Sequence, residues 1–275
     1  MKNKRTTLIS FKGIVIILAF LLCQASLRSA TITSAATGNW NAGATWVGGV
    51  VPAAGDNVII SGNFTVTVNT SASCNSVAIT GLAAGTGNSV LRITPGNTLT
   101  VATNVGIQPG TSATNPYFNA RLINNGSLVV GGNITMDASN ISQYGYAYFD
   151  QGAGSTTING NISAVGYDGS QTSILSFTGA GTIDLNGASS SLSVNAYSHV
   201  NFSSFAGNIN VNGSAGMVSI AANGTLTLGS GASNLNLSGS ITNAGTFAAG
   251  SASTFNYKGN TTQTIAALNY YHLTS

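Results

Sequence analysis

Short runs of alternating apolar and polar residues recur along most of this chain, separated by glycine, asparagine and serine. Successive side chains of a β-strand point to opposite faces, so each run would place its apolar residues on one face. Glycine and asparagine between the runs, as at Asn125 and Gly126, suit sharp turns because they tolerate left-handed backbone conformations. The pattern predicts strands over 64–68 and over Asn57–Ile60, Thr98–Val101, Ser127–Val130, Thr182–Leu185, Asn208–Val211, Thr225–Leu228 and Asn234–Leu237.

Two folds explain many short strands with regular turns, a β-sandwich and a β-solenoid. The solenoid is favoured because the pattern continues over most of the chain and similar units recur, such as INNGSLVVGGNI and AANGTLTLGS. Charge is also scarce, at 5% of residues, which suits coils in which a charge would lie directly above its neighbour. Each coil then buries its apolar face by stacking on the next. We expect residues 31–275 to form one all-β domain, a right-handed parallel β-helix.

The segment 38–68 contains both tryptophans, Trp40 and Trp46, followed by a turn signal at Gly55 and Asp56. If the chain is extended here, strand alternation puts both indoles on the same side. One interpretation is that they close the end of the β-stack and shield its apolar coils from water. The other is a platform on which sugar rings stack. We expect the segment to form an N-terminal cap and the first coils.

An ordered series of residues runs through this segment: Trp40, Thr45, Trp46, Gly48, Val51, Pro52, Gly55, Asp56, Val58, Ile60, Gly62, Val66 and Val68. The series resembles the start of an eight-glycine-type domain, as found at the N-terminus of large exported surface proteins of Bacteroidota. That resemblance implies β-helix repeats and a structural or adhesive role at the cell surface. It also implies partners among surface glycans or other cell-surface proteins.

The last segment, 255–274 (FNYKGNTTQTIAALNYYHLT), resembles a repeat unit of the same proteins. In those proteins the unit continues into further strands. We therefore expect residues 255–275 to be an incomplete terminal repeat. An open C-terminal coil would expose unpaired strand edges and allow self-association.

The first thirty residues differ in composition from the rest of the chain. Basic residues precede an apolar run at 13–23, and small residues follow it. This order predicts a secretory signal peptide over 1–30, cut after Ala25 or Ala30. The apolar run is too short for a membrane span, so a signal peptide is favoured over a membrane anchor. We expect a secreted or cell-surface protein with no membrane span once the signal is removed.

Removal of this segment changes the charge of the chain. The whole sequence carries eight basic and five acidic residues, but only three of the basic residues lie beyond position 30. Three scattered cations cannot neutralise a phosphate backbone, so a nucleic-acid partner is excluded.

Loss of Cys23 with the signal peptide leaves Cys74 alone, which excludes an intrachain disulfide. Cys74 is then either a small buried hydrophobe or a thiol that pairs between molecules.

Polysaccharide lyases and glycoside hydrolases also use β-helices, and they need paired carboxylates or acidic metal ligands. Successive coils could bring together two of the aspartates, but no Asp–Asp or Glu pair marks a site. The two histidines are far apart and have no cysteine partner, and no nucleotide-binding motif is present. We assign no catalytic residue, metal or cofactor, and a β-helix carbohydrate-active enzyme is the alternative function. The aspartates such an enzyme would use are Asp137, Asp150, Asp168 and Asp184.

Three tyrosines, Tyr144, Tyr146 and Tyr148, occupy alternate positions in the sequence QYGYAYFD. On a strand all three phenol rings would point to one face. One interpretation is a ladder of stacked aromatic rings inside the solenoid or along its edge. The other is a glycan-binding surface, because flat rings stack on sugars while hydroxyl groups hydrogen-bond to them. These three residues are the predicted ligand-binding residues.

Overall fold

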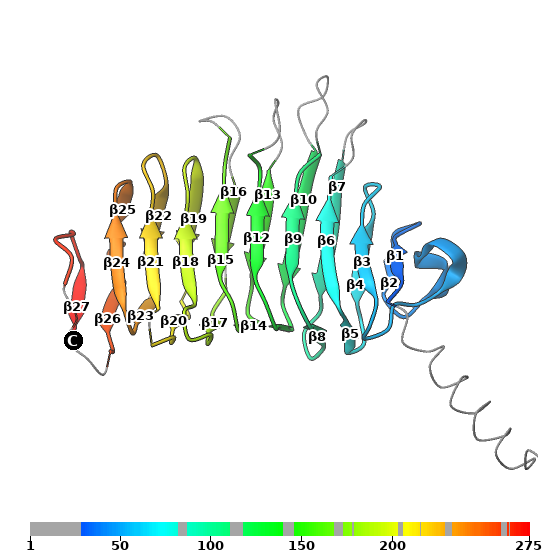
Figure 1. Ribbon diagram of the computed structural model, residues 1–275, viewed down its shortest axis with the longest axis horizontal. Helices are drawn as coiled ribbons and strands as arrows, with labels where there is room; N and C mark the ends of the chain where they lie inside the picture. Colours follow the sequence, from blue (N-terminus) through cyan, green and yellow to red (C-terminus); the bar gives the residue numbers. More distant parts are fainter. Residues whose placement is uncertain are drawn as a thin grey trace, which may run out of the picture.

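The computed structural model describes residues 29–81, 87–110, 118–139, 146–167, 173–177, 179–202, 206–214, 216–228, 233–259, 263 and 265–275. These residues form a parallel β-solenoid in which three nine-stranded sheets run along the length of the molecule (Figure 1). Each full coil gives one strand to the first sheet, one to the second and one to the third. The predicted all-β solenoid is confirmed. Most of the predicted signal peptide, Tyr144 and Asp168 lie outside the described residues.

The first sheet lies toward the viewer in Figure 1. Its parallel register aligns Val58 with Val77, Val77 with Val105, and Val105 with Ile134, so one aliphatic side chain lies above another along the sheet. Each of these side chains is buried. In order along the sheet its strands are β1 (Thr31–Thr33), β3 (Asn57–Ile60), β6 (Ser76–Thr80), β9 (Val105–Gln108), β12 (Ile134–Asp137), β15 (Ile162–Val165), β18 (Ser191–Val194), β21 (Met217–Ile220) and β24 (Ser240–Asn243).

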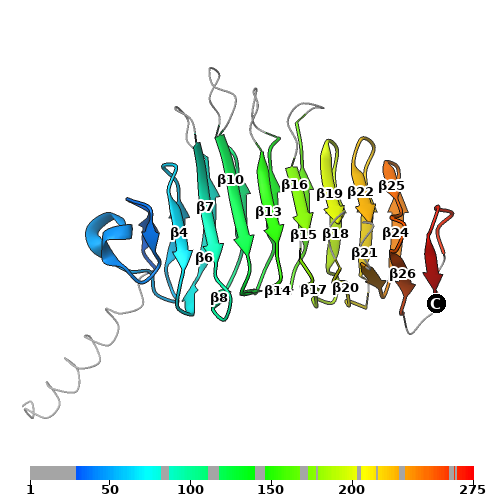
Figure 2. The same cartoon turned by 180° about the vertical axis from the view of Figure 1, so that it is seen from behind.

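The second sheet is seen from behind, in Figure 2. Leu91, Leu122, Phe149 and Leu175 are aligned in register and point inward, where they are fully buried. The residues between them point outward and form an outer face. The strands are β2 (Gly38–Asn39), β4 (Thr65–Val68), β7 (Gly87–Ile93), β10 (Phe118–Asn124), β13 (Ala147–Gln151), β16 (Ser173–Phe177), β19 (Ser198–Phe202), β22 (Thr225–Leu228) and β25 (Thr246–Ala248).

The third sheet completes the solenoid. Leu99, Leu128, Ile183 and Ile209 lie in one inward-facing row, which contains a polar residue, Thr156, at its third position. The strands are β5 (Ala72–Cys74), β8 (Thr98–Val101), β11 (Ser127–Val130), β14 (Ser155–Ile158), β17 (Thr182–Leu185), β20 (Asn208–Val211), β23 (Asn234–Leu237), β26 (Thr254–Tyr257) and β27 (His272–Thr274).

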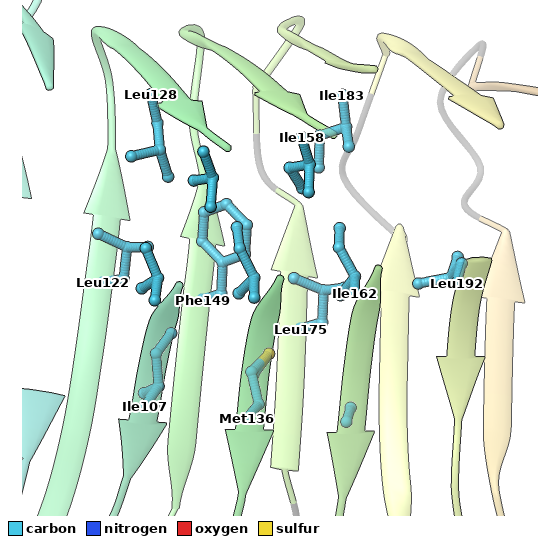
Figure 3. Packing of buried hydrophobic residues seen from close by; sticks show 14 of the residues in the cluster. Ile107, Leu122, Leu128, Met136, Phe149, Ile158, Ile162, Leu175, Ile183 and Leu192 are labelled. Atoms are coloured by element: carbon cyan, nitrogen blue, oxygen red, sulfur yellow. The ribbon is translucent and has the colours of Figure 1, made fainter. Parts of the chain in front are cut away.

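The interior between the three sheets is a continuous apolar core. Figure 3 shows Phe149 of the second sheet pointing into the same interior as Ile158 of the third sheet and Met136 of the first. Burial of such a side chain stabilises the fold by roughly 1.5–3 kcal/mol. The core therefore holds successive coils together along the whole length of the solenoid.

A buried polar network replaces apolar contacts at one corner of the core. The Asn124 Nδ2 donates to Thr156 Oγ1 at 2.8 Å, and Thr156 Oγ1 donates to Gln151 Oε1 at 2.6 Å. Gln151 Nε2 donates to the carbonyl oxygen of Gly154 at 2.7 Å. These bonds satisfy side chains that are fully buried, which is the condition for keeping polar groups in a core.

The two tryptophans lie at the N-terminal end, beside the short 3₁₀ helices η1 (Gly43–Thr45) and η2 (Val47–Gly49). Their ring centroids are 5.1 Å apart in an edge-to-face arrangement, and Trp46 Nε1 donates to the carbonyl oxygen of Trp40 at 2.7 Å. Only 1% of Trp40 and 2% of Trp46 is exposed. Neither indole therefore presents an open face to a sugar, and the sugar-platform interpretation of these residues is wrong. Their role as a cap stays a prediction.

The C-terminal end has its own aromatic cluster. Tyr270 lies against Phe247 and Phe255, with ring centroids 5.9 and 5.2 Å away. Its hydroxyl group is 3.1 Å from that of Tyr257. After this turn β27 pairs in parallel with β26, so the segment 255–275 adds one more strand to the third sheet.

Within the described residues no helix has the length and hydrophobicity needed to cross a membrane.

Candidate ligand-binding face

Aromatic and charged side chains gather on the outer face of the second sheet, on strands β7, β10 and β13. Figure 2 shows these three strands side by side. We call this surface the arginine–tyrosine face, defined by Arg92, Arg121, Tyr146, Tyr148 and Asp150. Strand alternation places them outside, because their neighbours along each strand are buried. The parallel register then brings them together from three successive coils.

Two of the three predicted tyrosines lie side by side on this face. The ring centroids of Tyr146 and Tyr148 are 5.6 Å apart and their planes are tilted by 38°. The backbone amide of Tyr146 donates to Asn119 Oδ1 on the neighbouring strand at 3.0 Å, which fixes the residue that leads into β13. Both rings are partly exposed, so they belong to the surface and not to the interior. Tyr144 lies outside the described residues.

Arg121 joins this tyrosine pair from the neighbouring strand. Arg121 and Tyr148 are register partners, and the guanidinium carbon of Arg121 lies 5.5 Å from the centre of the Tyr148 ring. Its Nε also donates to Asp150 Oδ2 in an ion pair. The Arg121 side chain is 44% exposed but the Asp150 side chain only 12%, so the cation is the accessible partner.

Burial changes the acid–base properties of this cluster. The pKa of Asp150 is raised because burial disfavours the charged carboxylate, and this effect outweighs the ion pair with Arg121, which lowers the pKa. The pKa of Tyr148 is also raised, first by burial and then by Tyr146, whereas Arg121 lowers it. Tyr148 therefore keeps its hydroxyl proton at neutral pH and can donate a hydrogen bond to a ligand.

Arg92 is the second cation of the face. It lies on β7, next to β10, and its register partner there is Ile123, two residues beyond Arg121. Arg92 is exposed, and within the described residues it forms no ion pair. It therefore presents a guanidinium group that no carboxylate of the described part neutralises.

Aliphatic side chains lie between the charged and aromatic groups of the face. Val90 is aligned with Arg121, Ile123 with Asp150, and Ile174 with Tyr148. Val90 points outward but is only 8% exposed, so neighbouring groups cover it. The face thus combines aliphatic side chains with arginine and tyrosine groups. This composition suits a ligand that has both apolar and polar surfaces.

The aspartates that an enzyme would use are on different faces. Asp137 ends a strand of the first sheet and accepts from the Ser139 hydroxyl at 2.5 Å. Asp150 lies on the second sheet, and Asp184 on the third, where Asn210 Nδ2 donates to it at 2.6 Å. The described part of the chain thus brings no two of these carboxylates to one face, and it contains no cluster of three possible metal ligands.

Cys74 ends β5 with 1% of the residue exposed. Burial, with a smaller contribution from Asp56, raises the pKa of its thiol to about 12. A thiol with this pKa is almost entirely protonated at neutral pH and is a poor nucleophile. The interpretation of Cys74 as a buried hydrophobe is confirmed.

The corner between the second and third sheets contains an open groove of about 460 Å³. Its walls are turn residues and small hydroxyl side chains from four successive coils, including Asn97, Gly126, Gly154 and Gly181. No charged or aromatic side chain lines it. The groove therefore offers hydrogen-bonding groups but little apolar or electrostatic energy for binding.

Comparison with protein-family models, with curated proteins and with solved structures gave no match.

Proposed function

We propose that this chain is an exported, cell-surface β-solenoid protein with a structural or adhesive role, and that it binds glycans through the arginine–tyrosine face. The observation that carries the binding proposal is that Tyr148 lies against both Tyr146 and Arg121 on an outward-facing sheet surface. Flat rings stack on the apolar faces of sugars, and guanidinium and hydroxyl groups hydrogen-bond to their edges.

The parallel sheet makes this surface rigid. Each strand under the face is hydrogen-bonded on both sides, so the side chains are held in place before a ligand arrives. Little conformational entropy is then lost on binding, which improves the affinity that a small contact area can reach. A solenoid that presents fixed side chains to an extended ligand is well suited to adhesion.

Two features of the sequence support a cell-surface location. One is the basic and apolar start of the chain, which has the order of a secretory signal. The other is the resemblance of residues 38–68 to the start of eight-glycine-type domains of exported Bacteroidota proteins. Location is tested by fractionating expressing bacteria and sequencing the N-terminus of the exported protein. We expect it to begin near residue 26 or 31, and an uncut protein retained in the cytoplasm would overturn this part of the proposal.

Glycan binding is tested on an array with the purified protein, followed by affinity measurement on each bound glycan. The variant Tyr146→Ala/Tyr148→Ala should weaken binding at least about tenfold, which corresponds to 1.4 kcal/mol. Tyr271→Ala is the matched control, because Tyr271 is 56% exposed and lies at the far C-terminal end. Equal binding by the folded double variant and the control would remove the tyrosines from the proposal. Release of shortened sugars from a bound glycan would show an enzyme instead.

A further inference from the structure

We infer that the ligand of the arginine–tyrosine face is an acidic polysaccharide, a polymer bearing carboxylate or sulfate groups, and that Arg92 is the residue that selects it. This inference rests on the proposed function, since it names the class of glycan that the same face binds. Three observations support it: where the charged residues lie, which partners each arginine has, and how the side chains are aligned across neighbouring strands.

Two of the three basic residues beyond position 30 lie on this one face. Beyond residue 30 the sequence has three basic residues, Arg92, Arg121 and Lys258, against five acidic ones. Both arginines lie on the face, where Asp150 is the acidic member of the defined set. An anionic polymer is thus attracted to this face and repelled by the acidic remainder of the chain.

The two arginines are in different states. The Nε of Arg121 donates to Asp150, and its guanidinium carbon lies 5.5 Å from the centre of the Tyr148 ring. Arg92 is exposed, and within the described residues no carboxylate is bonded to it. A guanidinium group binds carboxylate or sulfate through two parallel N–H···O bonds, which a neutral sugar cannot reproduce. Arg92 therefore distinguishes a charged sugar from a neutral one, while Arg121 and the tyrosines bind the ring of either.

The rows on the sheet suit a polymer that lies along the solenoid axis. Arg121 on β10 and Tyr148 on β13 are aligned in one row, and Arg92 on the adjacent strand β7 lies in the next row, with Ile123 and Asp150. Adjacent strands are about 4.8 Å apart. A chain of sugars crossing these strands would meet Arg92 first and then the tyrosine pair. His199 lies further along the row that contains Arg121 and Tyr148, beyond Ile174. The face is thus extended in the direction in which a polymer would run.

The test compares charged and neutral members of matched polymer pairs. Polygalacturonate is paired with its methyl ester to probe carboxylate, and dextran sulfate is paired with dextran to probe sulfate. We expect the protein to bind at least one charged polymer at least tenfold more tightly than its neutral partner. Which pair shows the difference identifies the anionic group. The variant Arg92→Gln should reduce this ratio to about threefold or less.

The control variant is Lys258→Gln, which removes one exposed positive charge at the C-terminal end of the third sheet. It should keep the preference for the charged polymer, and thermal unfolding should show that both variants are folded. Equal loss in the two variants would mean general attraction by net charge and would overturn the role of Arg92. Equal binding of charged and neutral polymers, with loss in the tyrosine variant, would overturn the inference and leave the proposed function standing. Absence of binding to every glycan would overturn both.

Discussion

Asp150 is the residue on which the charge of the candidate face depends. It is nearly buried, bonded to Arg121, and has a pKa raised by its burial. Above that pKa the carboxylate neutralises Arg121. Below it the proton neutralises the carboxylate and leaves the charge of Arg121 for a ligand. A single buried carboxyl group thus couples pH to the positive charge of the surface.

We expect binding of dextran sulfate to strengthen as the pH falls through the raised pKa of Asp150. Sulfate stays ionised over this range, so the change belongs to the protein. In Asp150→Asn this part of the pH dependence should disappear, because the amide does not titrate. The protein with Asp150 and the Asp150→Asn variant are compared by titration calorimetry at several pH values. Both carry His199→Gln, so that titration of His199 does not contribute to the difference. Among the described residues, the other charged or titratable groups on this surface are Arg92, Arg121, Tyr146, Tyr148 and His199. A pH dependence that is the same in both proteins would exclude Asp150 as its source.

We expect removal of the Arg121 guanidinium group to lower the free energy of unfolding. Arg121→Met leaves the Asp150 carboxylate, which is 12% exposed, without its ion-pair partner. Loss of one partner of a buried pair is strongly destabilising, but Arg121 is 44% exposed, so we expect a smaller loss of about 1–2 kcal/mol at neutral pH. The double variant Arg121→Met/Asp150→Asn should recover most of it, as measured by urea unfolding. A double variant no more stable than Arg121→Met would show that the packing of Arg121, and not its charge, stabilises the sheet.

At the level of elements, glycine allows the turns of successive coils to stack closely. A Cβ added at Gly181 would lie 1.9 Å from the carbonyl oxygen of Gly154, and one added at Gly154 would lie 2.0 Å from that of Gly126. These contacts are with backbone atoms, which cannot move without opening the stack. We expect Gly181→Ala to destabilise the protein by about 1–3 kcal/mol in denaturant unfolding.

The matched control for this change is Gly106→Ala in β9. Nothing lies within 4 Å of a Cβ added there, and the residue is on the outer side of its strand. Alanine at such a position should be neutral or should stabilise by about 0.4–1 kcal/mol, because it restricts the unfolded chain. Similar losses in both variants would mean that strand flexibility, and not the close approach of stacked turns, sets the requirement for glycine.

The strands that the sequence reveals are those in which alternation is regular. Thr98–Val101, Thr182–Leu185 and Asn234–Leu237 have the predicted bounds, because inward residues are apolar and outward residues are polar. The strand predicted at 64–68 begins one residue later, at Thr65. The strand Ala147–Gln151 does not alternate, because Tyr148 points outward but is aromatic, and Gln151 points inward but is polar. Buried polar groups and aromatic outer residues thus remove the pattern on which the prediction depends.

The candidate site shows a similar limit. The alternate spacing of the tyrosines predicts their common face, which the structure confirms for Tyr146 and Tyr148. The ion pair of Arg121 with Asp150 joins residues 29 apart in the sequence. This pairing can be predicted only when the number of residues in one coil is known. Irregular turns between the strands hide that length in the sequence. The register between coils, which determines the site, is therefore set by the core and not by a local motif.

At the scale of the whole molecule, stability is close to a sum over neighbouring coils, since each coil contacts only the coils on either side of it. Within the described residues the first and the last coil each pack against one neighbouring coil. Near the first coil Trp40 and Trp46 are packed into the core, and near the last coil Tyr270 packs on Phe247 and Phe255. Each end of the described solenoid thus contains a cluster of aromatic rings. Local opening is expected to begin at an end whose aromatic cluster is removed.

We predict that Trp46→Ala opens the N-terminal coils and leaves the distant ones unchanged. A buried tryptophan replaced by alanine costs about 3–5 kcal/mol, and in a solenoid this loss falls on the coils that contact it. Amide hydrogen exchange should therefore accelerate in β1, β3 and β4 but not in β20 and β23, which lie many coils away. Phe255→Ala is the matched control and should accelerate exchange in its own strand and in those that contact it, β23, β25 and β27, but not in β3 and β4. Exchange that rises evenly along the chain in both variants would mean that the solenoid unfolds as one cooperative unit, and the tryptophans would then contribute to the common core without acting as a cap.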